Sequence, residues 1–110
     1  MGLEGEQLAA DYLKKDGWVI HEMNYRFSRS EIDLIASKDD LLVFVEVKTR
    51  TNTSFRLPEE FVDDKKVPHI LKGADHYINE INWKGNIRFD IMAIIKKQDM
   101  EIKHIEYAFC

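Results

Sequence analysis

Hydrophobic residues follow two different periods along this chain, and these periods predict its secondary structure. A spacing of three to four residues, typical of one face of a helix, is found over residues 3–16 and again from Val67 to Ile81. Alternation with a period of two, or a short hydrophobic run, is typical of strands. The expected elements are a helix over 3–16, strands over 18–23, 30–38 and 41–50, a helix from Asp63 or Asp64 to Ile81, and strands over 87–95 and 101–109.

Residues with special backbone preferences define the boundaries of these elements. Gly17 is a natural stop for the first helix, and a polar loop is expected from the first strand through Ser30. Asp63 and Asp64 are both plausible N-caps of the second helix, provided that Pro68 falls in its opening turn. The order of elements predicts an α/β fold with a mixed sheet flanked by helices, the last strand at an edge, as a single domain over residues 1–110.

The strand over residues 41–50 carries two faces that differ along its length. From Leu41 to Val45 both faces are hydrophobic, which predicts a central strand covered on both sides. Glu46, Lys48 and Arg50 then share one face at the end of the strand. Charged residues gathered at one end of a buried strand indicate a functional site.

The preceding strand supplies further charged residues to this site. A hairpin that turns at Asp39-Asp40 pairs residue 38 with residue 41 and sets Asp33 opposite Glu46, with Cβ atoms about 5 Å apart. Two carboxylates this close repel each other unless a proton or a cation lies between them. Lys48 could pair with Glu31 across the same ladder. Because Asp-Asp is not a favoured two-residue turn, an odd loop length that shifts the register by one residue is the alternative.

Composition and charge limit the classes of function. Hydrophobic residues make up 45% of the 110 residues and charged residues 33%, as in soluble globular proteins. No hydrophobic run is long enough to cross a membrane and no signal-peptide pattern is found. The only cysteine, Cys110, excludes an internal disulfide, so we expect a cytoplasmic protein that does not contact membranes. The net charge of −4 argues against a protein that coats nucleic acid by bulk electrostatics.

Arginines nevertheless gather in the sequence near the hairpin. Arg26 and Arg29 precede it, and Arg50 and Arg56 lie in the segment 47–57, which has no acidic residue. Arginine suits bidentate contact with phosphate, so these four residues are candidate nucleic-acid contacts. For the first two, solvated surface charge is the simpler alternative. The polar stretch 51–60 is either a loop that closes over a substrate or a plain connector.

Other polar residues admit both a structural and a functional interpretation. Glu6 lies near the start of the first helix, where the helix dipole favours a carboxylate. Asp90 is either a buried, hydrogen-bonded residue near the site or an outward residue at a strand start. His69 and His76 share one helix face without an acidic partner, which favours surface histidines over metal ligands. Lys65, Lys66 and Lys72 are expected on exposed faces.

The motif EID, followed after twelve residues by EVK, resembles the PD-(D/E)xK nucleases. The longer string is similar to the YraN/UPF0102 family of predicted endonucleases, relatives of the archaeal Holliday-junction resolvases. The resemblance covers nearly the whole chain, in the segments GLEGEQLAADYL, NYRFSRSEIDLIA, VFVEVKTR, RFDIMAI and a terminal AF. Ser30 departs from the family pattern, which has Gly before EID.

The resemblance implies a restriction-endonuclease-like αβββαβ core and a metal-dependent endonuclease that cuts DNA or RNA, plausibly at branched structures. Asp33, Glu46 and the Val47 carbonyl would bind Mg²⁺ or Mn²⁺, and Lys48 would orient the nucleophile or steady the developing pentavalent phosphorus. The resemblance also gives Glu6 a second role as a site residue, and implies a possible homodimer. The alternative is a non-catalytic nucleic-acid-binding or protein-interaction module. A third possibility is that the charged residues form only a cross-strand ion-pair network.

Overall fold

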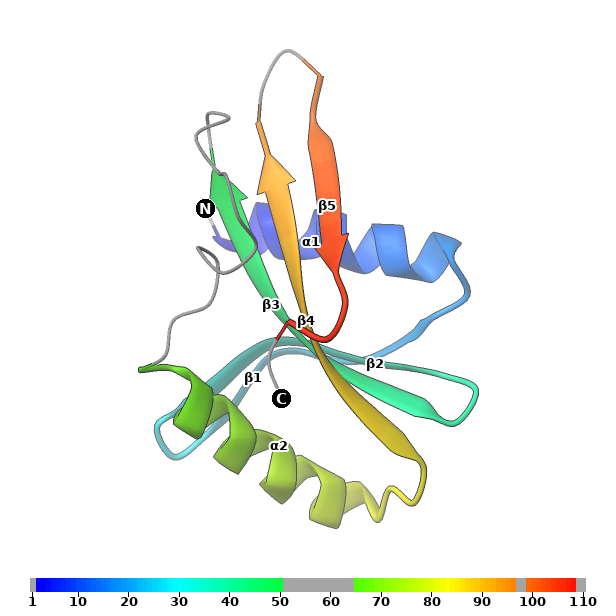
Figure 1. Ribbon diagram of the computed structural model, residues 1–110, viewed down its shortest axis with the longest axis vertical. Helices are drawn as coiled ribbons and strands as arrows, with labels where there is room; N and C mark the ends of the chain where they lie inside the picture. Colours follow the sequence, from blue (N-terminus) through cyan, green and yellow to red (C-terminus); the bar gives the residue numbers. More distant parts are fainter. Residues whose placement is uncertain (1, 51–64, 97–98, 109–110) are drawn as a thin grey trace.

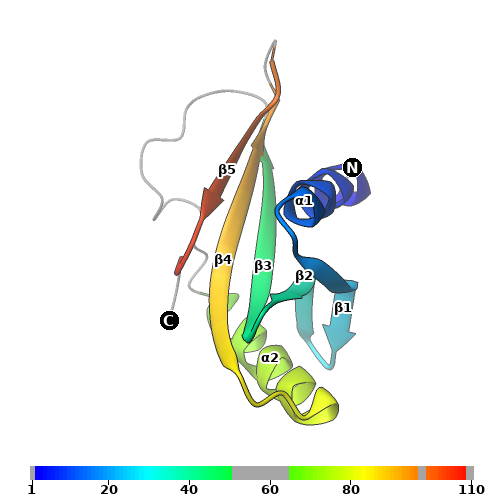
Figure 2. The same cartoon turned by 90° about the vertical axis from the view of Figure 1, so that its right-hand side faces the viewer.

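The computed structural model describes residues 2–50, 65–96 and 99–108 and contains a mixed sheet with one helix on each face (Figures 1 and 2). The order of elements agrees with the order expected from the hydrophobic pattern, and it is compatible with an αβββαβ core. The elements are α1 (Gly2–Lys15), β1 (Val19–Phe27), β2 (Ser30–Lys38), β3 (Leu41–Arg50), α2 (Val67–Ile81), β4 (Asn86–Ile95) and β5 (Glu101–Ile105).

The five strands follow one another across the sheet in sequence order, β1-β2-β3-β4-β5. Strands β3 and β4 are parallel and pair over their full lengths, from Leu41 with Asn86 to Arg50 with Ile95, while the other neighbours are antiparallel. The connection between β3 and β4 contains α2, as expected because parallel neighbours need a crossover. The prediction that residues 41–50 form a central strand is therefore confirmed, and so is the edge position of the last strand.

The two helices cover opposite faces of the sheet. Successive residues of β3 show this, since Val43 packs in the cluster around α1 and Phe44 packs in the cluster that contains α2. In Figure 1, α1 lies behind the upper half of the sheet and α2 lies in front of its lower half. Both faces of β3 are thus buried, which explains why its first half is hydrophobic on both sides. No described helix has the length and hydrophobicity needed to cross a membrane.

Strand β1 is longer than the sequence predicted, and the expected polar loop through Ser30 is wrong. The strand runs to Phe27, and only Ser28 and Arg29 form the turn into β2. Two aromatic rings explain the difference: Phe27 stacks on His76 with centroids 3.6 Å apart, and Tyr25 meets Tyr77 edge to face at 5.1 Å. Both partners lie on α2, far away in the sequence, so the local polarity of the segment did not reveal that it forms a strand.

The start of α2 also differs from the prediction. The helix begins at Val67 with Lys66 as its N-cap, and no side chain caps it by a hydrogen bond. Asp63 and Asp64, the expected caps, lie outside the described residues. Pro68 falls in the opening turn, as predicted, where its missing N–H leaves no helical hydrogen bond unmade.

Asp90 is buried and hydrogen-bonded, as the first of its two interpretations expected, but its partners belong to a cluster between β4 and β5 and not to the site. Its carboxylate accepts two hydrogen bonds of 2.8 Å from Arg88 and lies 2.7 Å from His104 Nε2. The Arg88 guanidinium in turn lies against the rings of Trp18 and Tyr107. Burial alone would raise the pKa of Asp90, but the hydrogen bonds from His104 and Arg88 lower it, so the carboxylate stays ionised.

Candidate functional site

The site lies where β2 and β3 separate. The ladder between them runs from Lys38 with Leu41 to Leu34 with Val45, which confirms the predicted register. Among the described residues the ladder stops there, so the expected cross-strand pair of Asp33 with Glu46 does not extend it. In Figure 1 the β1–β2 hairpin runs across the direction of β3 and β4.

A change in face at Asp33 accompanies this separation. Ile32 and Ile35 both pack in the cluster with α2, although residues three apart lie on opposite faces of a regular strand. Leu34, between them, packs on the α1 side. The Asp33 side chain closes the resulting gap, because the Val47 N–H donates a hydrogen bond of 2.7 Å to Asp33 Oδ2. The carboxylate thereby replaces a backbone acceptor of the sheet.

The pKa of Asp33 is raised because its carboxyl group is buried and lies near other carboxylates. Burial raises its pKa to about 7, and the negative charges of Glu46 and Glu6 act in the same direction. The hydrogen bond from Val47 and the charge of Lys66 oppose them. A carboxyl group that shares a buried region with two other carboxylates is held half-protonated near neutral pH unless a cation joins the group.

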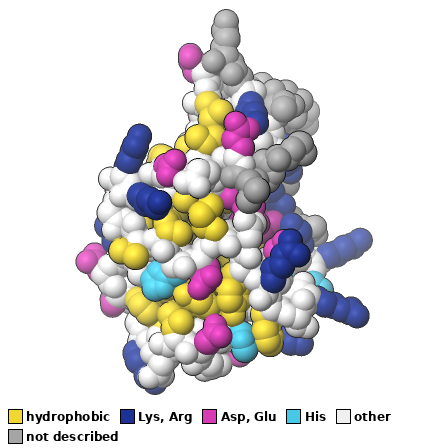
Figure 3. Space-filling model, turned by 180° about the vertical axis from the view of Figure 1, so that it is seen from behind, with side chains coloured by type: hydrophobic (Ala, Val, Ile, Leu, Met, Phe, Trp, Pro, Cys, Tyr) yellow, Lys and Arg dark blue, Asp and Glu magenta, His cyan; other side chains and the backbone are white. Residues whose placement is uncertain are grey.

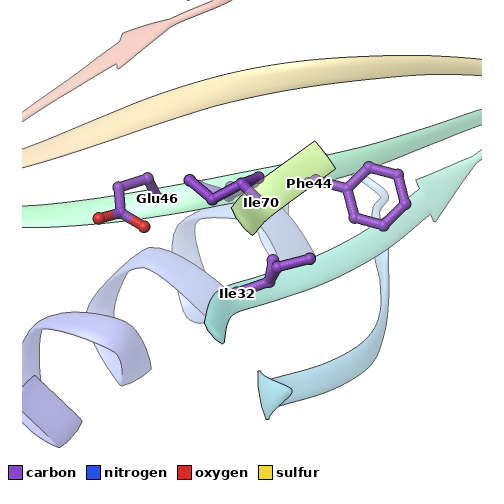
Figure 4. A pocket seen from close by; sticks show the side chains of 5 residues that line it. Ile32, Phe44, Glu46 and Ile70 are labelled. Atoms are coloured by element: carbon purple, nitrogen blue, oxygen red, sulfur yellow. The ribbon is translucent and has the colours of Figure 1, made fainter. Parts of the chain in front are cut away.

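Glu46 lies on β3 with its side chain almost fully buried. It lines a small hollow with Ile32, Phe44, Val45 and Ile70. Figure 4 shows its carboxylate turned away from the hydrophobic side chains of this hollow. The Oε2 atom lies 2.8 Å from Lys66 Nζ and 3.4 Å from Lys48 Nζ, so two ammonium groups share one carboxylate oxygen.

Glu6 approaches the same region from α1. Gly5 lets the helix come close to β3, since a Cβ on this glycine would lie 2.5 Å from Thr49 Oγ1. Because α1 begins at Gly2, Glu4 and not Glu6 occupies its first turn, and the dipole explanation for Glu6 is weakened. Glu6 is only 7% exposed, and its buried Oε1 has no hydrogen-bond partner among the described residues. A buried carboxylate oxygen without a donor is the ligand that a cation would satisfy.

Lys48 lies at the site, but its partner differs from the one expected. Its ammonium contacts Glu46, while Glu31 forms a surface ion pair of 2.9 Å with Arg26. The possible pairing of Lys48 with Glu31 is therefore wrong. The physical reason is that the ladder between β2 and β3 ends at Leu34 with Val45. Residues 31 and 48 lie beyond this end and do not face each other.

The three described arginines that were predicted to contact nucleic acid are exposed. Arg26 and Arg29 are exposed beside or within the β1–β2 turn, and Arg50 is exposed at the end of β3, where it donates to the Thr49 carbonyl. Figure 3 shows Lys and Arg side chains gathered at the edge where the β1–β2 turn and the start of α2 lie in Figure 1. Arg56 and the rest of segment 51–60 lie outside the described residues.

Sequence reasoning missed Lys66. Lys66 is exposed, as expected, but its ammonium also forms a 2.8 Å ion pair with Glu46, and this contact was not predicted. The sequence carries no signal for this contact, because it depends on where α2 begins after a connection of uncertain length. His69 is exposed, as expected, but His76 is half-buried beneath the Phe27 ring.

The described residues fit a divalent cation such as Mg²⁺ only if the protein supplies few of its ligands. No group of three His, Cys, Asp or Glu side chains within the described part of the chain is close enough to hold a metal. Magnesium, however, is commonly bound by one or two carboxylates and retained waters. The mutually repelling Asp33 and Glu46, with the unsatisfied oxygen of Glu6 nearby, suit such an ion. The Val47 carbonyl stays a prediction as the third ligand.

Comparison with known sequences adds a family to this geometry. The family model described as "Uncharacterised protein family UPF0102" matches residues 5–94. A UPF0102 protein of Christiangramia forsetii is 41% identical over 110 residues, covering 99% of this chain and 92% of the relative. A UPF0102 protein of Dictyoglomus thermophilum is 45% identical over 108 residues, covering 97% of this chain and 92% of the relative. The matched region contains every described residue of the site.

Proposed function

The chain belongs to the uncharacterised protein family UPF0102, and we propose that it is a metal-dependent endonuclease that hydrolyses phosphodiester bonds in DNA or RNA. One observation carries the proposal: the Glu46 carboxylate, whose charge raises the pKa of Asp33, lies 3.4 Å from the Lys48 ammonium at the point where two strands separate. Two oxygen-ligand side chains and a lysine are the components that metal-assisted phosphodiester hydrolysis requires. The PD-(D/E)xK resemblance assigns the same three residues.

Each residue has a distinct role in this proposal. Asp33 and Glu46 hold the cation through carboxylate oxygens, with the Val47 carbonyl as a further ligand. Asp33 is positioned by the hydrogen bond from the Val47 N–H, which keeps one of its oxygens directed at β3. Glu6 contributes negative charge, and its unpaired Oε1 is available to the ion or to a water next to it. When bound, Mg²⁺ or Mn²⁺ would acidify the attacking water and neutralise charge on the phosphate.

Lys48 acts in this scheme as a charge and not as a free base. Its ammonium lies 3.4 Å from Glu46 Oε2, where it forms an ion pair with this carboxylate. A protonated lysine orients the attacking water through hydrogen bonds, or stabilises the negative charge that grows on phosphate oxygens. Either role requires the nearly buried position that β3 gives this side chain.

Substrate binding in the proposal depends on local charge, because the net charge of −4 provides no general attraction. Arg26, Arg29 and Arg50 are exposed and are the described candidates for phosphate contact. Arg26 forms an exposed ion pair with Glu31. Because exposed ion pairs contribute little free energy, a phosphate can displace Glu31 at little cost.

The test is a cleavage assay with matched variants. Purified protein is incubated with branched, duplex and single-stranded DNA and with RNA, in Mg²⁺, Mn²⁺ or EDTA. We expect cation-dependent cleavage that Asp33→Asn lowers at least about 100-fold and Glu31→Gln leaves nearly unchanged, since Glu31 pairs with Arg26 at the surface. Equal cleavage by the Asp33→Asn variant, or none by the wild type on any substrate, would refute the proposal.

A second function is favoured by one observation. The described residues contain no set of three acidic, histidine or cysteine ligands, and Lys48 and Lys66 already neutralise Glu46. This arrangement is compatible with a module that binds nucleic acid or a protein without cutting. Tight binding of a nucleic acid by the wild type without cleavage, and equal binding by Asp33→Asn, would support that function.

A further inference from the structure

Lys66 and Lys48 contact the same atom of the site but come from different elements. Both ammonium groups lie near Glu46 Oε2, at 2.8 Å and 3.4 Å. Lys48 extends from β3 itself and its side chain is only 16% exposed, whereas Lys66 extends from the start of α2 and is 53% exposed. The proposed chemistry uses Lys48, and it leaves the shorter of the two ion pairs without a function.

A divalent cation at Asp33 and Glu46 would compete with both ammonium groups for Glu46 Oε2. Like charges a few ångströms apart repel, so at least one ammonium group has to move when the ion binds. Lys48 is confined by its surroundings, and a movement of this side chain would cost packing. The Lys66 side chain is 53% exposed and extends from the N-cap of α2, so it can move without disturbing buried packing. Lys66 is therefore the residue that can leave.

We propose that Lys66 is the internal counter-ion of Glu46, that it gives up this carboxylate to the divalent cation, and that its ammonium then contacts a phosphate of the nucleic-acid substrate. This inference rests on the proposed function. The flexible lysine side chain, anchored at the N-cap of α2, keeps its ammonium within reach of any phosphate at the ion. A lysine ammonium binds phosphate as a mobile point charge and does not need the fixed geometry of an arginine.

The surroundings of Lys66 support a phosphate as its second partner. Within the described part of the chain, the first turn of α2 contains no acidic residue, and Lys66 makes no capping hydrogen bond with its side chain, so the positive end of the helix dipole favours an anion there. Lys66 also lowers the pKa of Asp33, which shows that its charge acts on both carboxylates of the site. The same ammonium thus neutralises the site before the cation arrives and faces an anion afterwards.

The first experiment measures Mn²⁺ binding by titration calorimetry, independently of cleavage. Lys66→Gln removes the competing charge, so we expect Mn²⁺ to bind roughly 3- to 10-fold more tightly than to the wild type. Lys66→Arg retains the charge and should bind Mn²⁺ within about twofold of the wild type. Lys72→Gln is the matched control, because it deletes a charge from an exposed position on the same helix. Circular dichroism establishes that each variant is folded.

The second experiment measures binding of a labelled branched DNA in Ca²⁺ and in EDTA. With Ca²⁺ present, Lys66→Gln should weaken binding about fivefold or more, and the loss should become smaller in EDTA because Lys66 then contacts Glu46. Any loss caused by Lys72→Gln should be the same in both conditions.

The outcomes separate this inference from the proposed function. If Mn²⁺ binds the wild type and fails to bind Asp33→Asn, but Lys66→Gln binds it no more tightly than Lys72→Gln, the role of Lys66 is wrong and the metal site stands. If Lys66→Gln gains Mn²⁺ affinity without a Ca²⁺-dependent loss in DNA binding, the phosphate contact is refuted. If the wild type binds no Mn²⁺, both proposals fail together.

Discussion

Asp33 should destabilise the metal-free protein at neutral and alkaline pH, and Asp33→Asn should therefore make it more stable. The variant keeps the size of the side chain and an oxygen that can accept the Val47 N–H. It removes the charge that burial and the neighbouring carboxylates of Glu46 and Glu6 disfavour. A residue that holds a metal and lowers the stability of the empty protein is typical of a functional site.

The magnitude follows from the pKa of Asp33, which is raised from 3.8 to about 7. The folded protein holds a proton that the unfolded chain has already released, so stability falls as pH rises from about 4 to about 7 and is constant above that range. A rise of about 3 pKa units corresponds to about 4 kcal/mol at 1.36 kcal/mol per unit. After the cost of burying a neutral amide, we expect the variant to be about 2–4 kcal/mol more stable at pH 8, or roughly 10 °C higher in Tm.

Urea unfolding in EDTA, followed by the fluorescence of the buried Trp18, measures this difference at several pH values from 5 to 8. The advantage of Asp33→Asn should be clearly smaller at pH 5 than at pH 8. Asp75→Asn, at an exposed position of α2, should show no such pH dependence. Mn²⁺ at about 100 times its Kd should raise the free energy of unfolding of the wild type by about 2.7 kcal/mol and leave that of Asp33→Asn unchanged.

Two results would refute the reasoning. A difference below about 0.5 kcal/mol at pH 8 would mean that Asp33 is not penalised by its surroundings. A constant advantage at every pH would mean that the gain comes from packing and not from the carboxylate charge.

Two further predictions concern residues that support the fold. Gly73→Ala should destabilise the wild type by about 1–3 kcal/mol, because the new Cβ would lie 2.8 Å from Ser30 Cβ. In a Ser30→Gly background the same substitution should be neutral or stabilising. A double-mutant cycle by urea unfolding measures this coupling, and independent effects of the two substitutions would contradict it. Asp90→Asn should cost about 3–5 kcal/mol, because it leaves the buried Arg88 with only the more distant, exposed Glu106 as a counter-charge. Arg26→Gln should cost less than about 1 kcal/mol, because its ion pair is exposed. Similar losses in thermal unfolding would show that burial does not separate the two ion pairs.

The local pattern of the chain predicted most of the fold. The order of elements, the central position of residues 41–50 and the register of residue 38 with residue 41 were all read from hydrophobic period and turn position, and the structure agrees. These features are set by neighbours a few residues apart, so a local pattern carries them. The family was recognised in the same way, from motifs that are contiguous in the sequence.

The candidate site was predicted less completely. Asp33, Glu46 and Lys48 lie together, and Glu6 lies near them, but the partner of Lys48 was wrong and Lys66 was missed. Strand β1 continued to Phe27 through contacts with α2 that no local pattern indicates. The alternatives for Asp90 were separated only by its hydrogen bonds to Arg88 and His104.

The sequence by itself therefore determined which segments become helices and strands, how the central hairpin pairs, and which charged residues stand at the end of β3. Only the tertiary structure decided which ammonium group faces Glu46, why Asp33 titrates near neutral pH, and how far β1 extends. The physical reason is distance along the chain. Hydrophobic period is a property of near neighbours, whereas ion pairing and burial depend on where α1, α2 and the separating strands meet in space.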